Sequence, residues 1–343
     1  MRAYVAHRDR LLTIADAGGN AAIDSVRLRD RRLECVASHP VAPDRAFVGT
    51  FDDGLHRTVD GGETIERIGQ TIEPDAVMAV AIAPEDPDEI WVGTEPSQLY
   101  RSRDGGERFD RLRGIETVPS ADQWAFPPRP HTHHVRWIEP DPADQDRCFV
   151  GIEAGALLLT ADGGETWIDR PPGSRRDTHQ LATHPDAPGR VYSAAGDGYA
   201  ESTDGGESWS VRQAGLDHRY VWSVLPDPGD PDRVLVTAAT GPRSAHSTPG
   251  ESYCYRRSGG DAVDANASNG TDGSWERLDG PLSGEGVLRG VLAADGKSGH
   301  AYAATNRGCY RSTDFGTTWS RLDVEWPGAL REQTARGLAV VPS

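Results

Sequence analysis

Thr160-Ala-Asp162-Gly-Gly-Glu-Thr166-Trp167 is one of five copies of an octet that recurs along this chain of 343 residues. Each copy places Ser or Thr two residues before an Asp and a Gly two residues after it. The other copies occupy residues 58–65, 102–109, 202–209 and 312–319. A sixth copy is split by an insertion at 259–273. Recurrence on this scale predicts a repeat architecture rather than a single irregular core.

The chemistry of the octet favours a β-hairpin turn. The Asp carboxylate can accept backbone N–H groups across the turn, the glycines supply positive φ, and the final aromatic residue can pack between strands. We therefore expect a structural role for the five aspartates, which are Asp60, Asp104, Asp162, Asp204 and Asp314.

These octets resemble the Asp-box, or BNR, repeat of sialidase-like β-propellers. The resemblance covers essentially the whole chain and implies that the boxes lie on the face opposite any active site. It is closest to single-propeller microbial proteins that carry the label glycosyl hydrolase.

Short strands surround each box and define one propeller blade. In 77–113, for example, runs of β-branched and aromatic residues are separated by Pro, Gly and Asp, which is the pattern of four short strands. The same unit is read at 33–69, 77–113, 133–171, 179–213, 220–279 and 286–323.

The two ends of the chain predict a seventh blade. Residues 335–343 read as an innermost strand, whereas residues 3–28 read as the other three strands. Joined, these segments close the ring and remove the open sheet edges. The predicted fold is all-β, a single seven-bladed β-propeller domain of four-stranded blades spanning 1–343.

Composition limits the partners. The formal net charge is −17, and Lys297 is the only lysine among 36 basic residues. Such an acidic chain repels polyanions, so we expect no nucleic-acid or membrane partner. The excess of carboxylates with arginine in place of lysine indicates a halophilic source, and a GC-rich genome is the alternative. No run of 18 apolar residues is present, and we expect a cytoplasmic monomer.

A column of polar residues marks the upper face. In six blades we align the innermost strand on the proline that ends it, and in the blade at 286–323 we align it on Asp295. The residue six positions before this point is polar in all but one blade. The column is Glu34, Met78, His134, His179, Tyr220, Arg289 and Arg336. The long segments predicted to lie on the same face are 114–132, 171–178, 213–219, 241–252 and 323–333. Polar lining of a water-filled channel is the alternative explanation.

The column suits an anionic or sugar ligand. Arg289 and Arg336 offer forked donors for a carboxylate, sulfate or phosphate. Tyr220 is a candidate base if nearby cations lower its pKa, with His179 or His134 as the acid. Further ligand-binding candidates are Glu34, Arg136, Arg219 and Trp124. No cofactor is required, and the alternative is a divalent metal held by His134, His179 and Glu34.

The resemblance leaves function open. The superfamily includes sialidases, xyloglucanases, sortilin-type receptors and photosystem II assembly factors, and fold does not transfer function. Seven blades and two column arginines argue against a true sialidase. An enzyme here would be glycoside hydrolase-like or polysaccharide lyase-like. The alternative is a non-catalytic scaffold for a protein partner, resembling the photosystem II assembly-factor propellers.

Overall fold

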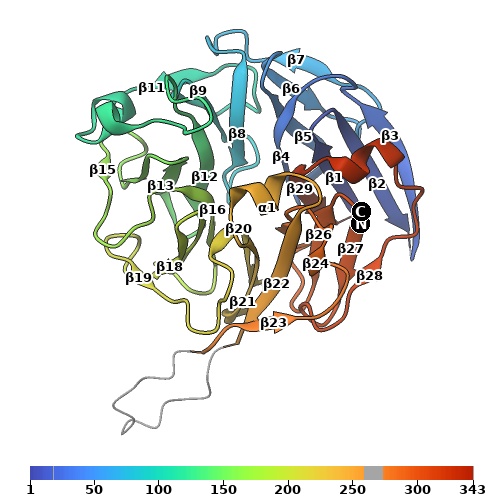
Figure 1. The fold of residues 1–343 in the computed structure, drawn as a ribbon. Helices are drawn as coiled ribbons and strands as arrows, with labels where there is room; N and C mark the ends of the chain where they lie inside the picture. Colours follow the sequence, from blue (N-terminus) through green and yellow to red (C-terminus); the bar gives the residue numbers. More distant parts are fainter. Residues whose placement is uncertain (18, 259–272, 343) are drawn as a thin grey trace, which may run out of the picture.

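Seven antiparallel sheets surround a central axis in the computed structural model (Figure 1). The described residues are 1–17, 19–258 and 273–342, so the insertion at 259–273 lies outside them except for Gly273. The predicted seven-bladed propeller is confirmed. No helix among the described residues has both the length and the apolar composition needed to cross a bilayer.

Each blade runs from an innermost to an outer strand. The innermost strands are β4 (Leu33–His39), β8 (Ala76–Ile82), β12 (Val135–Asp141), β16 (Thr178–Thr183), β20 (Tyr220–Asp227), β25 (Val291–Ala293) and β29 (Ala335–Val341). The second strands are β5 (Ala42–Thr50), β9 (Ile90–Glu95), β13 (Asp144–Ile152), β17 (Val191–Ala195), β21 (Asp230–Ala239), β26 (Ala301–Thr305) and β1 (Arg2–His7). Neighbouring innermost strands contact one another around the ring.

In most blades the third and outermost strands are shorter in total than the two inner strands. The third strands are β6 (Leu55–Thr58), β10 (Leu99–Ser102), β14 (Ala156–Thr160), β18 (Gly198–Ser202), β22 (Glu251–Arg257), β27 (Gly308–Ser312) and β2 (Arg10–Ala17). The outermost strands are β7 (Glu66–Ile68), β11 (Asp110–Leu112), β15 (Ile168–Asp169), β19 (Ser210–Val211), β23 (Glu276–Leu278), β28 (Ser320–Arg321) and β3 (Asn20–Arg27). A short strand, β24 (Gly284–Glu285), pairs with β22.

The two ends of the chain close the ring as predicted. Strand β29 pairs antiparallel with β1, and the sheet continues through β2 to β3. Figure 1 shows the N- and C-terminal ends side by side. Because β29 completes this sheet, no blade is left with an unpaired innermost position.

The Asp boxes form the turns between third and outermost strands. Asp162 Oδ1 accepts the amide of Thr166 at 2.9 Å and the hydroxyl of Thr160 at 2.8 Å. In the next blade, a Cβ at Gly206 would lie 2.4 Å from the ring of Phe149, so glycine allows this turn to pack on the preceding blade. The boxes therefore brace neighbouring blades.

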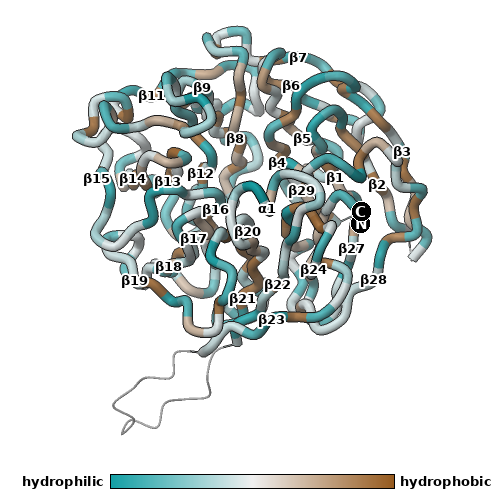
Figure 2. Tube along the Cα trace, in the orientation of Figure 1, coloured by the Kyte–Doolittle hydropathy of each residue, from teal (hydrophilic) through white to brown (hydrophobic). Residues whose placement is uncertain are grey.

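Irregular segments cover the start of the innermost strands. They contain the helix α1 (Pro242–His246) and the 3-10 turns Ile115–Thr117, Ala121–Gln123 and Gly328–Glu332. Figure 1 shows α1 lying across the centre of the ring, and Figure 2 shows that this segment is mostly hydrophilic. A polar element above a channel mouth points to a site at this end of the propeller.

Candidate functional site

A ring of β-bulges surrounds the mouth of the channel. In six innermost strands the pairing register skips one residue close to the start of the strand, which leaves that residue unpaired. The skipped residues are Glu34, Met78, Arg136, His179, Trp222 and Arg336. A bulge re-aims the side chain of its extra residue, so the repeat directs one side chain toward the axis in each of these six blades.

The bulges correct the predicted column in two blades. Strands β12 and β20 end in Pro-Asp-Pro, and the pairing shows that the second proline, Pro142 or Pro228, corresponds to the single proline of other blades. Counting six residues back from these prolines gives Arg136 and Trp222 instead of His134 and Tyr220. The two predicted residues lie two positions earlier, at the rim of the same opening.

A cavity of about 550 Å³ occupies the mouth. Its wall includes six of the seven column residues, namely Glu34, Met78, His134, Tyr220, Arg289 and Arg336. The long segments 114–132, 171–178, 241–252 and 323–333 each contribute to the wall, whereas 213–219 does not. This volume lies within the usual range of about 300–1,000 Å³ for small-molecule sites.

The cavity is positively charged although the chain is acidic. Its wall contains six arginines, which are Arg8, Arg32, Arg129, Arg136, Arg289 and Arg336. Four carboxylates share the wall, which are Glu34, Glu153, Asp177 and Glu332. The formal charge of the wall is therefore +2, in a chain of −17. A local reversal of sign attracts anions into the cavity.

Arg289 is a buried cation held by neutral groups. It is 2% exposed, its Nε and one terminal nitrogen both donate to the Ala335 carbonyl at 3.3 Å, and its guanidinium lies 3.5 Å above the ring of Trp222. Within the described part of the chain, no carboxylate pairs with it. Burial and the charges of Arg336 and Arg136 lower the pKa of Arg289. An anion in the cavity would offset this unfavourable burial.

His246 of α1 links Arg289 to Tyr220. The other terminal nitrogen of Arg289 lies 2.9 Å from His246 Nδ1, and His246 Nε2 lies 2.8 Å from the Tyr220 hydroxyl. Burial and Arg289 lower the pKa of His246 to about 2, so the ring is neutral. Arginine only donates, so Nδ1 accepts and Nε2 donates its proton to Tyr220. The Tyr220 hydroxyl keeps its own proton for another acceptor.

The expectation that neighbouring cations lower the pKa of Tyr220 is wrong. Burial raises the pKa, and the carboxylates of Glu153 and Asp177 raise it further. These effects exceed the lowering by Arg289 and Arg136. Tyr220 is therefore a hydrogen-bond donor here, not the base that the sequence suggested.

His179 and His134 take different positions. His179 is 1% exposed and lines a narrower hollow below the cavity rather than the cavity itself. Its Nδ1 donates to the Val221 carbonyl at 2.7 Å, and burial lowers its pKa. His134 Nε2 lies 2.8 Å from Glu153 Oε2. Hydrogen bonding to His134 and the charge of Arg136 lower the pKa of Glu153 despite its burial.

The predicted metal set is not brought together. Glu34 pairs with Arg336 at 3.2 Å, and His134 is engaged by Glu153. Among the residues that the structure describes, the imidazole and carboxylate groups close enough to share an ion are those of Glu153, Asp177 and His179. Of the three residues predicted from sequence, only His179 belongs to this group.

Two predicted ligand residues lie away from the cavity. Trp124 is buried in an apolar cluster with Ile115 and Val118, and its Nε1 donates to Ser120 Oγ at 2.8 Å. Arg219 is exposed and does not belong to the cavity wall. Trp124 thus anchors the 114–132 segment, because its large ring completes the core beneath that segment. Arg136, in contrast, lies in the wall as predicted, 4.8 Å from Trp222.

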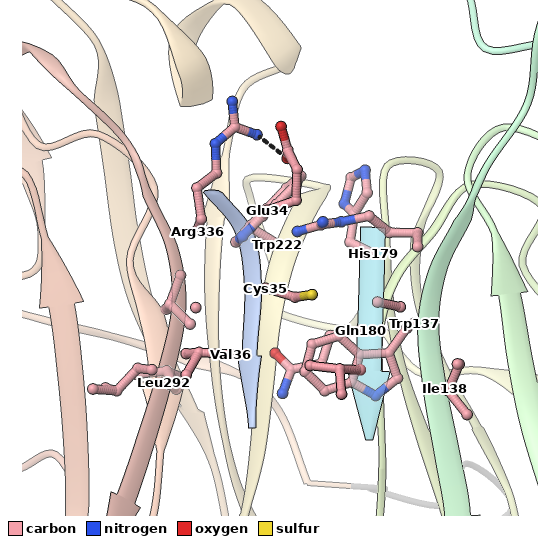
Figure 3. Close-up of a pocket in the computed structure, with 16 residues that line it drawn as sticks. Glu34, Cys35, Val36, Trp137, Ile138, His179, Gln180, Trp222, Leu292 and Arg336 are labelled. Carbon is pink, nitrogen blue, oxygen red and sulfur yellow. Dashed lines mark ion pairs between the residues drawn. The ribbon is translucent and has the colours of Figure 1, made fainter. Parts of the chain in front are cut away.

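The channel narrows below the cavity. The lower hollow is about 50 Å³, and both hollows share Glu34, Arg136, Trp222 and Arg336 in their walls. Figure 3 shows Arg336, Glu34 and His179 at one end of this hollow, with Trp137, Ile138 and Leu292 toward the other. The charged groups therefore belong to the mouth, and the lower channel is largely apolar.

Sequence reasoning missed Trp222, His246 and Glu153 as site residues. The second proline of Pro226-Asp227-Pro228 is a signal that identifies Trp222. For His246 the sequence offers none, because its place depends on how an irregular segment folds across the ring. Glu153 follows a second strand, where the alignment of innermost strands does not reach.

Comparisons with known proteins agree with this architecture. The family model of the BNR/Asp-box repeat matches residues 310–321, which include the whole of the last octet. No curated protein matches the chain in sequence. Among solved structures, an ancestral GH74 enzyme is 16% identical with a TM-score of 0.60, over 81% of this chain and 36% of that one. The chain thus spans about a third of that enzyme's length.

Two further structures are similar. The GH74 xyloglucanase from Xanthomonas campestris is 16% identical, with a TM-score of 0.59, over 91% of this chain and 46% of its own. YCF48 bound to D1 peptide is also 16% identical, with a TM-score of 0.56, over 85% of this chain and 82% of its own. At this identity the likeness concerns the fold. The chain folds as a seven-bladed β-propeller, and its match to the BNR/Asp-box repeat lies at residues 310–321.

Proposed function

We propose that this propeller binds a small anionic ligand, of the size of an acidic monosaccharide, in the cavity at the channel mouth. The observation that carries the proposal is Arg289, a buried guanidinium without a carboxylate partner among the described residues. Three of its five N–H groups have acceptors, which leaves two for a ligand.

The remaining wall supports a ligand with both charged and hydroxyl groups. Arg336 lies beside Glu34 and is available to share an anion with Arg289. The Tyr220 hydroxyl donates toward an acceptor, and Glu34 and Asp177 can accept sugar hydroxyls. Phe126 and Trp222 provide apolar surface for the C–H groups of a ring. This mixture is that of a small-molecule site, with few polar groups that fix orientation.

For a reaction in the cavity, the arrangement favours Tyr220 as a proton donor. His246 donates to the Tyr220 oxygen and would stabilise a developing phenolate, while Arg289 holds His246 in the required tautomer. Changing Tyr220 to Phe would then lower turnover more than affinity. If affinity and turnover fell equally, Tyr220 would be a binding residue only.

A protein partner is the second candidate. YCF48, whose structure is solved with D1 peptide, resembles this chain over most of its own length. In this reading the arginines of the mouth would receive an acidic side chain or a terminal carboxylate of a peptide. An acidic peptide would then bind while a free uronic acid would not.

Calorimetric titration distinguishes a small anionic ligand from an acidic peptide. EDTA-treated protein at constant ionic strength is titrated with glucuronate, with glucose as the neutral control, and with an acidic peptide. We expect glucuronate to bind in one equivalent, and Arg336→Ala to weaken it by roughly 1.5–3 kcal/mol, the value of a hydrogen bond to a charged group. Arg113→Ala, which removes an exposed arginine outside the cavity, is the matched control. Equal affinity for glucose and glucuronate would refute the proposal.

A further inference from the structure

Three side chains converge where the cavity meets the channel. Glu153 follows β13, Asp177 precedes β16, and His179 lies on the bulge of β16. His179 Nε2 lies 4.0 Å from Glu153 Oε1 and 3.9 Å from Asp177 Oδ2. All three atoms fall within 4.8 Å of one another.

Each of these side chains forms a hydrogen bond through one of its two polar atoms and leaves the other polar atom free. His134 Nε2 bonds the other carboxylate oxygen of Glu153 at 2.8 Å. The amide of Ala154 donates to the other oxygen of Asp177 at 2.9 Å. His179 donates its Nδ1 proton to the Val221 carbonyl. Such outer contacts orient ligands in metal sites.

In the neutral ring, the free nitrogen of His179 has no hydrogen-bond donor opposite it among the described residues. A carbonyl only accepts, so a neutral ring that donates from Nδ1 carries a lone pair on Nε2. That atom is fully buried and has no hydrogen-bond partner in the structure. It faces two carboxylate oxygens, and three electron-rich atoms converge without a donor between them. A cation at their centre would satisfy all three.

We propose that Glu153, Asp177 and His179 bind one divalent transition-metal ion of the Zn²⁺ type. Zn²⁺ takes imidazole nitrogen at about 2.0–2.1 Å and carboxylate oxygen at about 2.0–2.2 Å. Tetrahedral ligands at these lengths lie about 3.4 Å apart, so the two distances from His179 Nε2 must close by roughly 0.6 Å through side-chain rotation. The nitrogen ligand favours a transition metal over Mg²⁺.

The surroundings admit such an ion. Glu153 and Asp177 also line the cavity, so the fourth ligand position faces the volume where the anion is proposed to bind. Gly196 makes room for Asp177, since a Cβ there would lie 2.0 Å from Asp177 Oδ2. Arg136 is the nearest cation, with Nε 3.8 Å from Glu153 Oε2. It contacts the oxygen already bonded to His134 and leaves the free oxygen available.

The test is a titration of EDTA-treated protein with Zn²⁺ by calorimetry and with Co²⁺ by visible absorption. Excess Mg²⁺ is present to occupy surface carboxylates. We expect one equivalent of each ion and a Co²⁺ spectrum with nitrogen coordination. Asp177→Asn and Glu153→Gln should weaken Zn²⁺ at least tenfold, and His134→Gln about 10–100-fold, as for an outer-shell partner.

Asp186→Asn is the matched control, an exposed carboxylate after the far end of the same strand. It should leave the affinity unchanged. The proposal is overturned if wild-type protein binds no stoichiometric Zn²⁺ or Co²⁺, or if Asp177→Asn and Glu153→Gln, both folded by circular dichroism, bind as wild type does. Because the anion titration uses metal-free protein, either site can fail while the other stands.

Discussion

Replacing Arg289 with Met separates ligand binding from folding. Methionine keeps an unbranched side chain at this position but removes the guanidinium, with its charge and its contact with Trp222. The guanidinium is 2% exposed and bonded to Ala335 and His246. If it is held for a ligand, its loss should weaken the affinity without unfolding the protein.

The magnitudes follow from these contacts. A charge-assisted bond to the anion contributes roughly 1.5–3 kcal/mol, so affinity should fall about 10–150-fold. For stability, an unpaired Ala335 carbonyl costs roughly 1–3 kcal/mol, and the lost cation–π contact about 2 kcal/mol. Removing the buried, unpaired charge stabilises the folded state by several kcal/mol. The net change in unfolding free energy should stay within about 2 kcal/mol.

Arg257 is the matched control. It is 4% exposed and lies 5.4 Å from the ring of Trp275, but it forms an ion pair with the buried carboxylate of Glu201. Arg257→Met leaves that carboxylate with the Tyr199 hydroxyl and with longer contacts to two other arginines. It should destabilise the fold by about 3–5 kcal/mol, as expected for a broken buried pair, and leave anion affinity unchanged.

Urea unfolding and calorimetric titration of both variants decide the outcome. If Arg289→Met unfolds as readily as Arg257→Met and binds glucuronate as tightly as wild type, then Arg289 is a structural clamp on β29. The reasoning about an unpaired cation would then be refuted.

Three other predictions concern the fold. Ending the chain before Ala335 removes the six-residue pairing between β29 and β1, so the melting temperature should drop by many degrees; an unchanged value would contradict the closure. Raising KCl from dilute buffer to molar concentration should raise the melting temperature, because salt screens the −17 charge; an unchanged melting temperature would favour the GC-rich alternative to a halophilic source. Hydrogen bonds from Thr166 lower the pKa of Asp162 to about 2. Because this lies below the unfolded value of about 3.9, the folded state binds fewer protons, and the contribution of the carboxylate to stability is present above pH 4 and lost toward pH 2. Asp162→Asn should therefore flatten acid unfolding in that window, and equal acid profiles would exclude this role.

The fold was readable because it is local and repeated. Each octet carries its own turn chemistry, and Asp162 and Gly164 meet their partners within six residues. The strands around each octet are marked by runs of β-branched and aromatic residues that Pro, Gly and Asp separate. Closure of the ring by β29 could also be predicted from the sequence, because residues 3–28 supply only three of the four strands of a blade.

The site residues could be predicted from the sequence only where the repeat is regular. Strands with a single terminal proline gave the bulged residues Glu34, His179 and Arg336. Strands with Pro-Asp-Pro shifted the alignment by two residues and hid Trp222. Side chains contributed by irregular segments, such as His246, depend on tertiary packing, which no local pattern encodes. Burial raises the pKa of Tyr220, whereas the sequence suggested a lowered value, because burial also depends on tertiary packing.

A crystal structure with glucuronate, at a concentration near its measured Kd, tests the central claim most directly. We expect the carboxylate of the ligand within hydrogen-bonding distance of Arg289 and Arg336, with a ring hydroxyl at Tyr220. Density for the ligand only outside this cavity, or an empty cavity in protein that binds glucuronate in solution, would contradict it.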